Sequence, residues 1–586
     1  DRNPRRPLSL MPSRHEHGST TVLEWSDVSV ALAGKVLVSP NSGSLQSSEL
    51  VCIMGPSGAG KTTLLSALFG DKDLAQGTVH LRGEPLFRNK RRSSRRRHVA
   101  SEMGYVRQRD IFIEALTVKE TLLFTARLRM PEASNAEVAA RVAAVVHDMG
   151  LQQTLDTTIG STMRRGISGG ELKRVNIAAE LLGMPKVLLL DEPTSGLDST
   201  FALLVMAKLR SYAAAHGVGC LCTLHQPSLQ ILELVDRVVL MAPGGATVFS
   251  GGPASLAAHL HRLELGAPDR LSLADHAMQL LCDPAESTRL ESEWSTAAPT
   301  ICVAVVGPDA SANAAAEVSM SRTKLRRRAR LPFHRTVWLL ARRQVRQSRS
   351  TLLKADEIAL NVLIGVITGL IWWQSAGSDA EQGALFFFVA HMTWWPGFLY
   401  LFAFPAEVAV LTKELLSDAY SIEAYLLSKV VADTPSEIVC PSVFFACALP
   451  MCGFEPVASV CIWLTMLLQF QTSAIIGMLC SIVSDHPRCP ISANTLISAV
   501  NVLQMCAGGF LRDPRTYPGG LRWLSYTSIF YYSSSIISQV SSPTHTADPR
   551  YSPLGLGANV ATLLAITVGL KLCLYVSLKS RNLRFA

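Results

Sequence analysis

The chain has 586 residues, more than one hydrophobic core usually holds, so at least two domains are expected. Hydrophobic residues make up 48% of the chain and charged residues 17%, which excludes an ordinary soluble protein and favours one with a part in lipid. The net charge of +9 does not indicate nucleic acid, because the basic residues lie in runs beside the apolar half, where an anionic membrane surface explains them.

The first half of the chain is predicted to be an α/β domain. Residues 1–21 form a polar N-terminal segment, and regular patterning begins at Val22. Over residues 22–298, strand-like apolar runs alternate with helical patterns, as in Leu50–Met54 followed by Thr62–Phe69. The basic run Arg88–Arg97 is expected to be a surface loop that contacts lipid head groups, is phosphorylated at Ser93 or Ser94, or is simply solvated.

The second half is predicted to be an all-α polytopic membrane domain. Residues 299–331 are rich in Ala, Ser and Thr and read as a linker, and residues 332–353 as an amphipathic helix at the membrane interface. The domain itself covers residues 354–586, where about six apolar segments approach the roughly 20 residues that a bilayer crossing needs. These segments are 357–373, 383–405, 433–453, 457–483, 490–510 and 558–578, with prolines expected to interrupt the third.

The distribution of cations predicts the orientation of these spans. Lys and Arg gather on one side of the membrane, whereas the loops at 374–382 and 453–456 carry none. Both termini and the α/β domain are therefore expected in the cytosol. The membrane is the plasma membrane or an internal one.

A phosphate-binding loop lies between a strand and a helix of the first half. Residues 55–62 fit the pattern GxxxxGK[ST], and a glycine turn without a ligand is a poor alternative in this setting. Glycines let backbone N–H groups surround phosphates, the lysine supplies positive charge, and the hydroxyl at position 62 can bind Mg²⁺. The predicted nucleotide contacts are Gly55, Pro56, Ser57, Gly58, Ala59, Gly60, Lys61, Thr62 and Thr63.

Two carboxylates end a second apolar strand, Val187–Leu190. Asp191 is suited to holding Mg²⁺ and Glu192 to orienting a water molecule for ATP hydrolysis. A strand ending in two acids is weak evidence alone, so the interpretation depends on the motifs around it.

Those motifs resemble the ATP-binding cassette superfamily. They are Gln108 in GYVRQ, Ser168-Gly169-Gly170-Glu171, Ser195-Gly196-Leu197-Asp198, and His225 in LHQP, and all occur in the family's order. The resemblance implies that Gln108 contacts Mg²⁺ and transmits motion, that His225 contacts the γ-phosphate, and that Glu192 is catalytic. It also implies that Ser168, Gly169, Gly170 and Asp198 complete the nucleotide site of a second chain. The alternative for a lone histidine such as His225 is a purely structural role.

The order of domains is similar to that of the ABCG (White) half-transporters. The sequence SGGELKR from Ser168, the segments around Glu407, Lys413 and Tyr425, and Gly508-Gly509-Phe510 carry this resemblance over residues 22–586. It implies a homo- or heterodimer driven by ATP and Mg²⁺. The chain departs from the family pattern at Ser272–His276 and Leu415. It has no cysteine in the expected external region and no N-x-[ST] sequon, so neither an external disulfide nor an N-glycan is expected.

The membrane half contributes two further hypotheses. A charged helix with Glu407, Lys413, Glu414 and Asp418 is expected at the cytosolic face, where it receives the motion of the first domain, the alternative being a solvated helix. In the family the second and fifth spans flank a central cavity, and a lipid, sterol or amphipathic drug-like cargo suits the side chains there, the alternative being plain helix packing. Those side chains are Phe386, Phe387, Phe388, Met392, Trp394 and Trp395, then Asn494, Asn501, Gln504 and Met505.

Three functions compete at this point. The first is an exporter or floppase in which ATP closes two cassettes and reorients the spans. The second is a soluble ATP-binding cassette protein acting on DNA or ribosomes, which the apolar spans oppose. The third is an ATP-gated membrane regulator or channel partner that carries no cargo of its own.

Overall fold

The computed structural model describes residues 20–32, 34–86, 102–160, 165–266, 272–304, 330–351, 355–484, 489, 491–541 and 554–584. The basic run 88–97, nearly all of the N-terminal segment and most of the linker therefore lie outside the described residues. The chain divides into two compact units, each described by itself. Unit 1 comprises residues 1–110, 133–155 and 167–328, and unit 2 comprises residues 111–132, 156–166 and 329–586.

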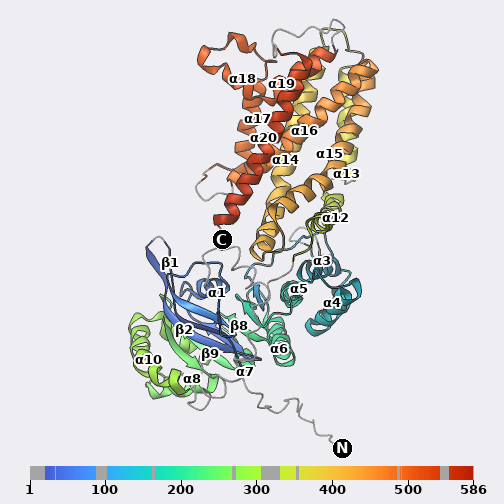
Figure 1. The fold of residues 1–586 in the computed structure, drawn as a ribbon. Helices are drawn as coiled ribbons and strands as arrows, with labels where there is room; N and C mark the ends of the chain where they lie inside the picture. Colours follow the sequence, from blue (N-terminus) through green and yellow to red (C-terminus); the bar gives the residue numbers. More distant parts are fainter. Residues whose placement is uncertain are drawn as a thin grey trace, which may run out of the picture. The chain divides into compact units, whose positions relative to one another are not determined.

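A six-stranded sheet is the centre of unit 1 (Figure 1). Its strands lie in the order β10-β9-β3-β8-β7-β6 and all pairs are parallel except β10 with β9. The strands are β3 (Leu50–Met54), β6 (Met103–Val106), β7 (Val187–Leu190), β8 (Gly219–Thr223), β9 (Arg237–Met241) and β10 (Thr247–Gly251). Every residue of β3, β6, β7 and β8 is buried, as expected for parallel strands covered on both faces.

A second, antiparallel sheet of four strands packs beside the first through a shared apolar core. Its order is β2-β1-β4-β5, with β1 (Thr21–Leu32), β2 (Lys35–Gln46), β4 (Gln76–Leu81) and β5 (Glu84–Pro85). Leu23, Trp25 and Val79 of this sheet share a core with Ile53 of β3 and Leu189 of β7. The core thus fixes β3, which leads into the glycine-rich loop.

Helices complete unit 1. They are α1 (Lys61–Phe69), α4 (Asn135–Met149), the short 3₁₀ helix η1 (Gln152–Thr154), α5 (Gly169–Leu181), α6 (Ser199–His216), α7 (Leu229–Leu234), α8 (Pro253–Arg262), α9 (Leu273–Cys282) and α10 (Pro284–Ala304). Ser134 and Ser168 cap α4 and α5 through capping boxes, which explains where these helices begin.

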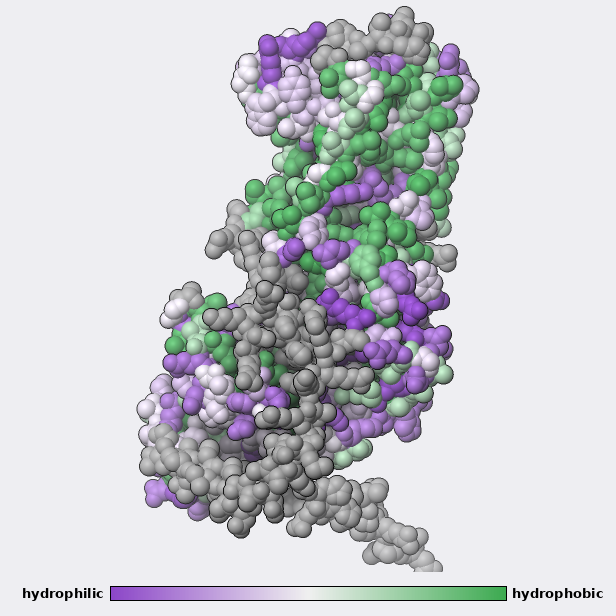
Figure 2. Space-filling view, viewed as in Figure 1, coloured by the Kyte–Doolittle hydropathy of each residue, from purple (hydrophilic) through white to green (hydrophobic). Residues whose placement is uncertain are grey.

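Unit 2 is helical. Its elements are α3 (Val118–Arg129), α12 (Phe333–Thr351), α13 (Ala355–Ile371), α14 (Glu381–Leu416), α15 (Ile422–Cys452), α16 (Pro456–Ser484), α17 (Ala493–Ala507), η2 (Pro514–Thr516), η3 (Gly519–Leu521), α18 (Trp523–Thr527), α19 (Ile529–Ser541) and α20 (Leu556–Arg584). Within the described ranges, four helices, α14, α15, α16 and α20, are long and apolar enough to cross a membrane, and α13 and α17 are shorter apolar helices. Figure 2 shows apolar side chains over much of the long helices.

Two details of the predicted membrane half are wrong, and one helix was not predicted. Prolines do not interrupt the third segment, because α15 runs continuously through Pro435, Pro441 and Pro450. The four charged residues do not all lie in one helix, because Glu407, Lys413 and Glu414 belong to the last part of α14 whereas Asp418 lies beyond its end. The segment after α17 also contains α19, a helix that hydrophobicity did not reveal because buried serines, Ser533–Ser535, occupy its middle.

The segment that follows Gln108 belongs to unit 2 although it lies far from the membrane helices in sequence. Leu128 of α3 is part of the large core formed by α14, α15 and α16. The Arg343 guanidinium of α12 lies 4.1 Å from the centre of the Phe124 ring, and Arg346 forms an ion pair with Glu120. Residues 111–132 are therefore packed as part of the helical unit.

Candidate functional site

The candidate site lies at one edge of the six-stranded sheet. The strands β3, β8, β7 and β6 are neighbours and parallel, so their carboxyl ends meet at the same edge. The glycine-rich loop follows β3, His225 follows β8 by two residues, Asp191 and Glu192 follow β7, and Gln108 follows β6 by two residues. Topology alone thus gathers residues that are up to 170 positions apart in sequence, and ligands of parallel α/β sheets bind at such edges.

The loop at residues 55–60 has a backbone that requires glycine. A Cβ atom on Gly55 would lie 2.3 Å from the carbonyl oxygen of Met241, and Gly60 has a φ of +95°. The loop leads directly into α1, which begins at Lys61 and leaves its first N–H groups without partners inside the helix. Ser57 and Gly58 are exposed, so the loop is open to a phosphate group.

Lys61 is buried, and its ammonium is held over the loop. Its Nζ donates to the carbonyl oxygens of Gly55 at 2.6 Å and Pro56 at 3.0 Å. Burial lowers the pKa of Lys61 from its ordinary value, although the nearby carboxylates of Glu192 and Asp191 oppose this shift. A bound phosphate would favour the charged form of this side chain.

Asp191 is clamped by two hydroxyl groups. Its Oδ1 accepts from Thr62 Oγ1 at 3.0 Å and from Thr223 Oγ1 at 2.9 Å. Burial raises the pKa of Asp191, and these two hydrogen bonds oppose that rise. The carboxylate is thereby fixed beside the Thr62 hydroxyl, which gives two oxygen atoms suitable for a hard divalent cation.

Glu192 points toward the end of β6. Its Oε2 accepts from Gln108 Nε2 at 2.8 Å, and its backbone N–H donates to Thr223 Oγ1 at 2.9 Å. Its φ of +48° is unusual for a residue other than glycine, and such strain gathers at functional sites. A carboxylate held in this way is placed to orient a water molecule.

The residues that hold Gln108 lie on α5. Lys173 Nζ donates to the carbonyl oxygen of Gln108 at 3.1 Å and forms a 2.9 Å ion pair with Asp110. Asn176 Nδ2 also donates to Asp110, at 2.5 Å. The helix that begins at Ser168 therefore fixes the backbone around Gln108.

Ser168, Gly169, Asp198 and His225 lie at the surface of unit 1, whereas Gly170 is buried. Ser168 and Gly169 are exposed at the beginning of α5, where Ser168 Oγ donates to Glu171 of its own helix at 2.8 Å. Asp198 is exposed and caps α6 by accepting from the backbone N–H groups of Thr200 and Phe201. The two exposed segments are neighbours, because a Cβ atom on Gly170 would lie 3.2 Å from Phe201. His225 is exposed as well.

The structure thus brings together five predicted residues, Lys61, Thr62, Gln108, Asp191 and Glu192. Sequence reasoning missed Thr223, which bonds to both Asp191 and Glu192, and Lys173, which holds Gln108. The only signal for Thr223 was a polar residue at the end of the apolar run that precedes His225. Lys173 gave none, because a lysine near a helix start is ordinarily solvated.

The fold and the site define a P-loop ATPase joined to a helical membrane domain, which is the architecture of an ABC transporter. Comparison with protein families agrees with this class. The ABC transporter model matches residues 38–195, and models of the ABC-2 type transporter match residues 335–540 and 225–298.

Relatives define the family more closely. ABC transporter G family member 21 of Arabidopsis thaliana is 31% identical over 526 residues, which cover 85% of this chain and 76% of that protein. ABC transporter G family member 22 of the same plant is 30% identical over 592 residues, covering 94% and 76%. Protein white of Drosophila melanogaster is 30% identical over 513 residues, covering 83% and 72%.

The chain belongs to the ABC transporter G family. It therefore binds nucleotide, is a multi-pass membrane protein, and couples an ATPase to transport across the membrane. The prediction of an α/β cassette followed by apolar helices is confirmed.

Proposed function

We propose that this chain works as one half of a dimer that uses ATP hydrolysis to export or flop a lipid, a sterol or an amphipathic small molecule. The observation that carries the proposal is that the predicted nucleotide-site residues of one chain fall into two separate groups. Lys61, Thr62, Asp191 and Glu192 are gathered around the loop, whereas Ser168 and Asp198 are exposed beyond it. A second chain would bring its own Ser168 and Asp198 to this loop.

The chemistry of the site fits ATP with Mg²⁺. Thr62, Asp191 and Gln108 offer a hydroxyl, a carboxylate and an amide oxygen within one hydrogen-bonded cluster, and oxygen donors of this kind suit Mg²⁺. Bound Mg²⁺ would neutralise charge on the phosphates. Lys61 would hold the β- and γ-phosphates, Glu192 would orient the attacking water, and His225 would contact the γ-phosphate.

A contact inside unit 2 supports coupling between ATP and the membrane helices. Lys413 Nζ, near the end of α14, donates to the carbonyl oxygen of Ile111 at 3.2 Å and lies 4.1 Å from the centre of the Phe112 ring. Ile111 is three residues after Gln108. A displacement of Gln108 would therefore be transmitted along three residues of the chain to Ile111. From there the contact with Lys413 would pass it to the charged end of α14.

The proposed cargo path lies where α14 faces α17. Phe386 stacks on Phe510 with ring centres 4.0 Å apart, and Asn501 is buried with neither side-chain amide atom paired to any residue in the described part of the chain. An aromatic surface beside an unsatisfied amide suits a flat cargo with a polar group. Phe388 and Met392, predicted to line the same path, are instead fully buried in the helix core.

The cation distribution supports cytosolic placement of unit 1 and of both termini. The experiment that tests the proposal is ATP-dependent flux in vesicles reconstituted with the purified chain. Glu192→Gln should bind ATP and support no flux. A 1:1 mixture of wild type and Glu192→Gln should lose well over half of the wild-type flux if both sites of a dimer must hydrolyse ATP. ATP turnover without flux of any amphipathic cargo would favour the alternative, an ATP-gated regulator or channel partner.

A further inference from the structure

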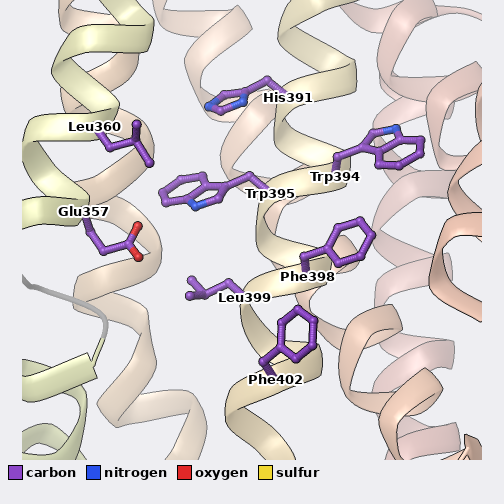
Figure 3. A pocket seen from close by; sticks show the side chains of 8 residues that line it. All are labelled: Glu357, Leu360, His391, Trp394, Trp395, Phe398, Leu399 and Phe402. Carbon is purple, nitrogen blue, oxygen red and sulfur yellow. The ribbon is translucent and has the colours of Figure 1, made fainter. Parts of the chain in front are cut away.

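A groove of about 510 Å³ separates α13 from α14 in unit 2. Figure 3 shows that its walls come from these two helices, with Glu357 and Leu360 on α13 and Trp395, Leu399 and Phe402 on α14. The two helices have different packing partners, α15 for α13 and α16 for α14, which leaves the space between them open. A space of this size accommodates a drug-sized molecule.

Two polar groups reach into this otherwise apolar groove from opposite sides. In Figure 3, Glu357 extends from α13 toward α14, and the His391 ring extends from α14 toward α13. Glu357 Oε2 and His391 Nε2 are both buried, and neither has a hydrogen-bond partner among the residues that the structure describes. Buried polar atoms are normally paired, so each is a place where a ligand atom would be stabilised.

The His391 ring is held in one orientation. It is parallel to the Phe387 ring (3°, 6.0 Å between centres) and to the Trp395 ring (4°, 5.7 Å), and it lies 4.8 Å from the Phe444 ring. The Trp395 ring is in turn fixed edge-to-face against Phe470 at 5.5 Å. This wall of the groove is therefore built of packed rings, and it presents aromatic faces together with one ring nitrogen.

The charge of the groove selects its ligand. Among the described residues that line the groove, Glu357 is the one charged side chain, and a buried carboxylate oxygen without a partner in an apolar site gains most from a cation. Aromatic faces also attract an ammonium group and stack on flat apolar rings. Phe402 and Leu360 are 70% and 45% exposed on the outside of apolar helices, so a ligand dissolved in lipid has access.

We propose that the groove between α13 and α14 binds an amphipathic ammonium compound, with its cationic nitrogen at Glu357, a polar atom at His391 Nε2 and its apolar body against Trp395, Leu399 and Phe402. The inference rests on the proposed function insofar as it names a cargo class, and it concerns a site different from the path between α14 and α17. Binding here requires neither ATP nor a second chain.

The test uses two probes that differ in one group. The full chain in nanodiscs is titrated without ATP with 1-pyrenemethylamine, a cation, and with 1-pyrenemethanol, its neutral counterpart, while quenching of tryptophan emission is recorded and signals from empty nanodiscs are subtracted. Glu357→Gln removes the charge and keeps the shape, and Glu455→Gln is the matched control at an exposed site. Phe402→Leu removes an exposed aromatic wall, and Phe333→Leu, 52% exposed on α12, is its control.

Glu357→Gln should weaken binding of the amine at least tenfold and leave binding of the alcohol unchanged. Phe402→Leu should weaken both probes by roughly threefold, as expected for loss of one aromatic contact. The controls should bind as the wild type does. Equal affinity of wild type and Glu357→Gln for the amine overturns the proposal, and so does an equal loss for both probes.

Two sources of the ammonium group are separable by lipid composition. If a choline headgroup occupies the groove, the part of amine binding that depends on Glu357 disappears in phosphatidylcholine and is present in phosphatidylglycerol. If a free amine is the ligand, this part is present in both. Because the measurement needs no ATP, a chain that binds the amine but transports nothing would contradict the proposed function alone, and a chain that transports cargo without binding the amine would contradict the groove alone.

Discussion

The Thr223 hydroxyl donates to Asp191 Oδ1 at 2.9 Å while accepting the backbone N–H of Glu192 at the same distance. One buried side chain on β8 therefore sets the positions of both acidic residues that follow β7. This arrangement explains how two carboxylates at a strand end keep separate directions, Asp191 toward Thr62 and Glu192 toward Gln108.

Thr223→Val should lower ATPase activity about tenfold to a hundredfold, because small displacements of catalytic groups have effects of that size. The valine keeps the shape of threonine but leaves the Glu192 N–H without its partner and the Asp191 carboxylate with one hydroxyl donor, Thr62, in place of two, which costs about 1–3 kcal/mol for each lost bond. Thr223→Ser restores the hydroxyl and should recover most activity. Thr288→Val, at an exposed threonine of α10, is the control. Wild-type turnover in Thr223→Val would show that Thr223 has no positioning role.

The affinity for ATP should fall in alkaline solution because of Lys61. Burial lowers the pKa of this lysine below its ordinary value of 10.5, and bound phosphate favours the charged form. Affinity is therefore full below the lowered pKa and falls as the pH rises through it, which ATP titrations between about pH 7 and 10 would detect. Lys61→Arg keeps its charge throughout and should give a flat profile, whatever its absolute affinity. If the ATP affinity of both proteins fell equally with rising pH, the effect would belong to another titratable group.

Asp191 should destabilise the nucleotide-free protein at neutral pH. Burial raises its native pKa above the ordinary value of 3.8, so the native state binds the proton more tightly than the unfolded state does. The contribution of Asp191 to the free energy of unfolding is then most favourable below about pH 3.8. It decreases as the pH rises from 3.8 through the raised pKa of the native state. Asp191→Asn should therefore raise the midpoint of thermal unfolding of unit 1 at pH 7 without nucleotide, and should lose the further rise that Mg-ATP gives the wild type. A lower midpoint for the variant without nucleotide would contradict this sign.

The sequence predicted the residues that local pattern determines. The strands Leu50–Met54 and Val187–Leu190 have the predicted bounds, because a short fully apolar run before a glycine-rich loop or an acidic pair leaves little freedom. Thr223 and Lys173 were not predictable, since their roles depend on β8 lying beside β7 and on α5 lying beside Gln108. In the membrane half, hydropathy located the apolar segments but not α19, whose buried serines look polar in sequence.

Lys413→Met should uncouple ATP turnover from transport. The variant loses the hydrogen bond to Ile111 O and the cation over the Phe112 ring, whereas the residues around Asp191 stay intact. Flux per ATP hydrolysed should fall severalfold with ATPase activity retained, and Lys413→Arg should recover part of it. Lys119→Met, at an exposed lysine of α3, should leave the ratio unchanged. An unchanged ratio in Lys413→Met would remove this contact from the coupling path.

Lys429 is buried on α15 between two carboxylates. Its Nζ lies 2.8 Å from Glu407 of α14 and 2.9 Å from Asp433, and the Lys429 side chain is only 6% exposed. Lys429→Met leaves both carboxylates without this cation and should lower the free energy of unfolding by about 3–5 kcal/mol. Adding Glu407→Gln and Asp433→Asn removes the excess negative charge, so the triple variant should be more stable than Lys429→Met alone.

Thermal unfolding of the full chain in nanodiscs measures both effects, and Lys579→Met, at an exposed lysine of α20, is the control. Recovery in the triple variant would mean that Lys429 mainly balances charge, because the new amides cannot replace its ammonium group. If the triple variant were instead less stable than Lys429→Met, the ammonium would be needed for its geometry, as a link that joins α14 to α15 beside the Tyr400 and Phe404 rings. The prediction fails in that case, since it attributes the instability of Lys429→Met to uncompensated carboxylates.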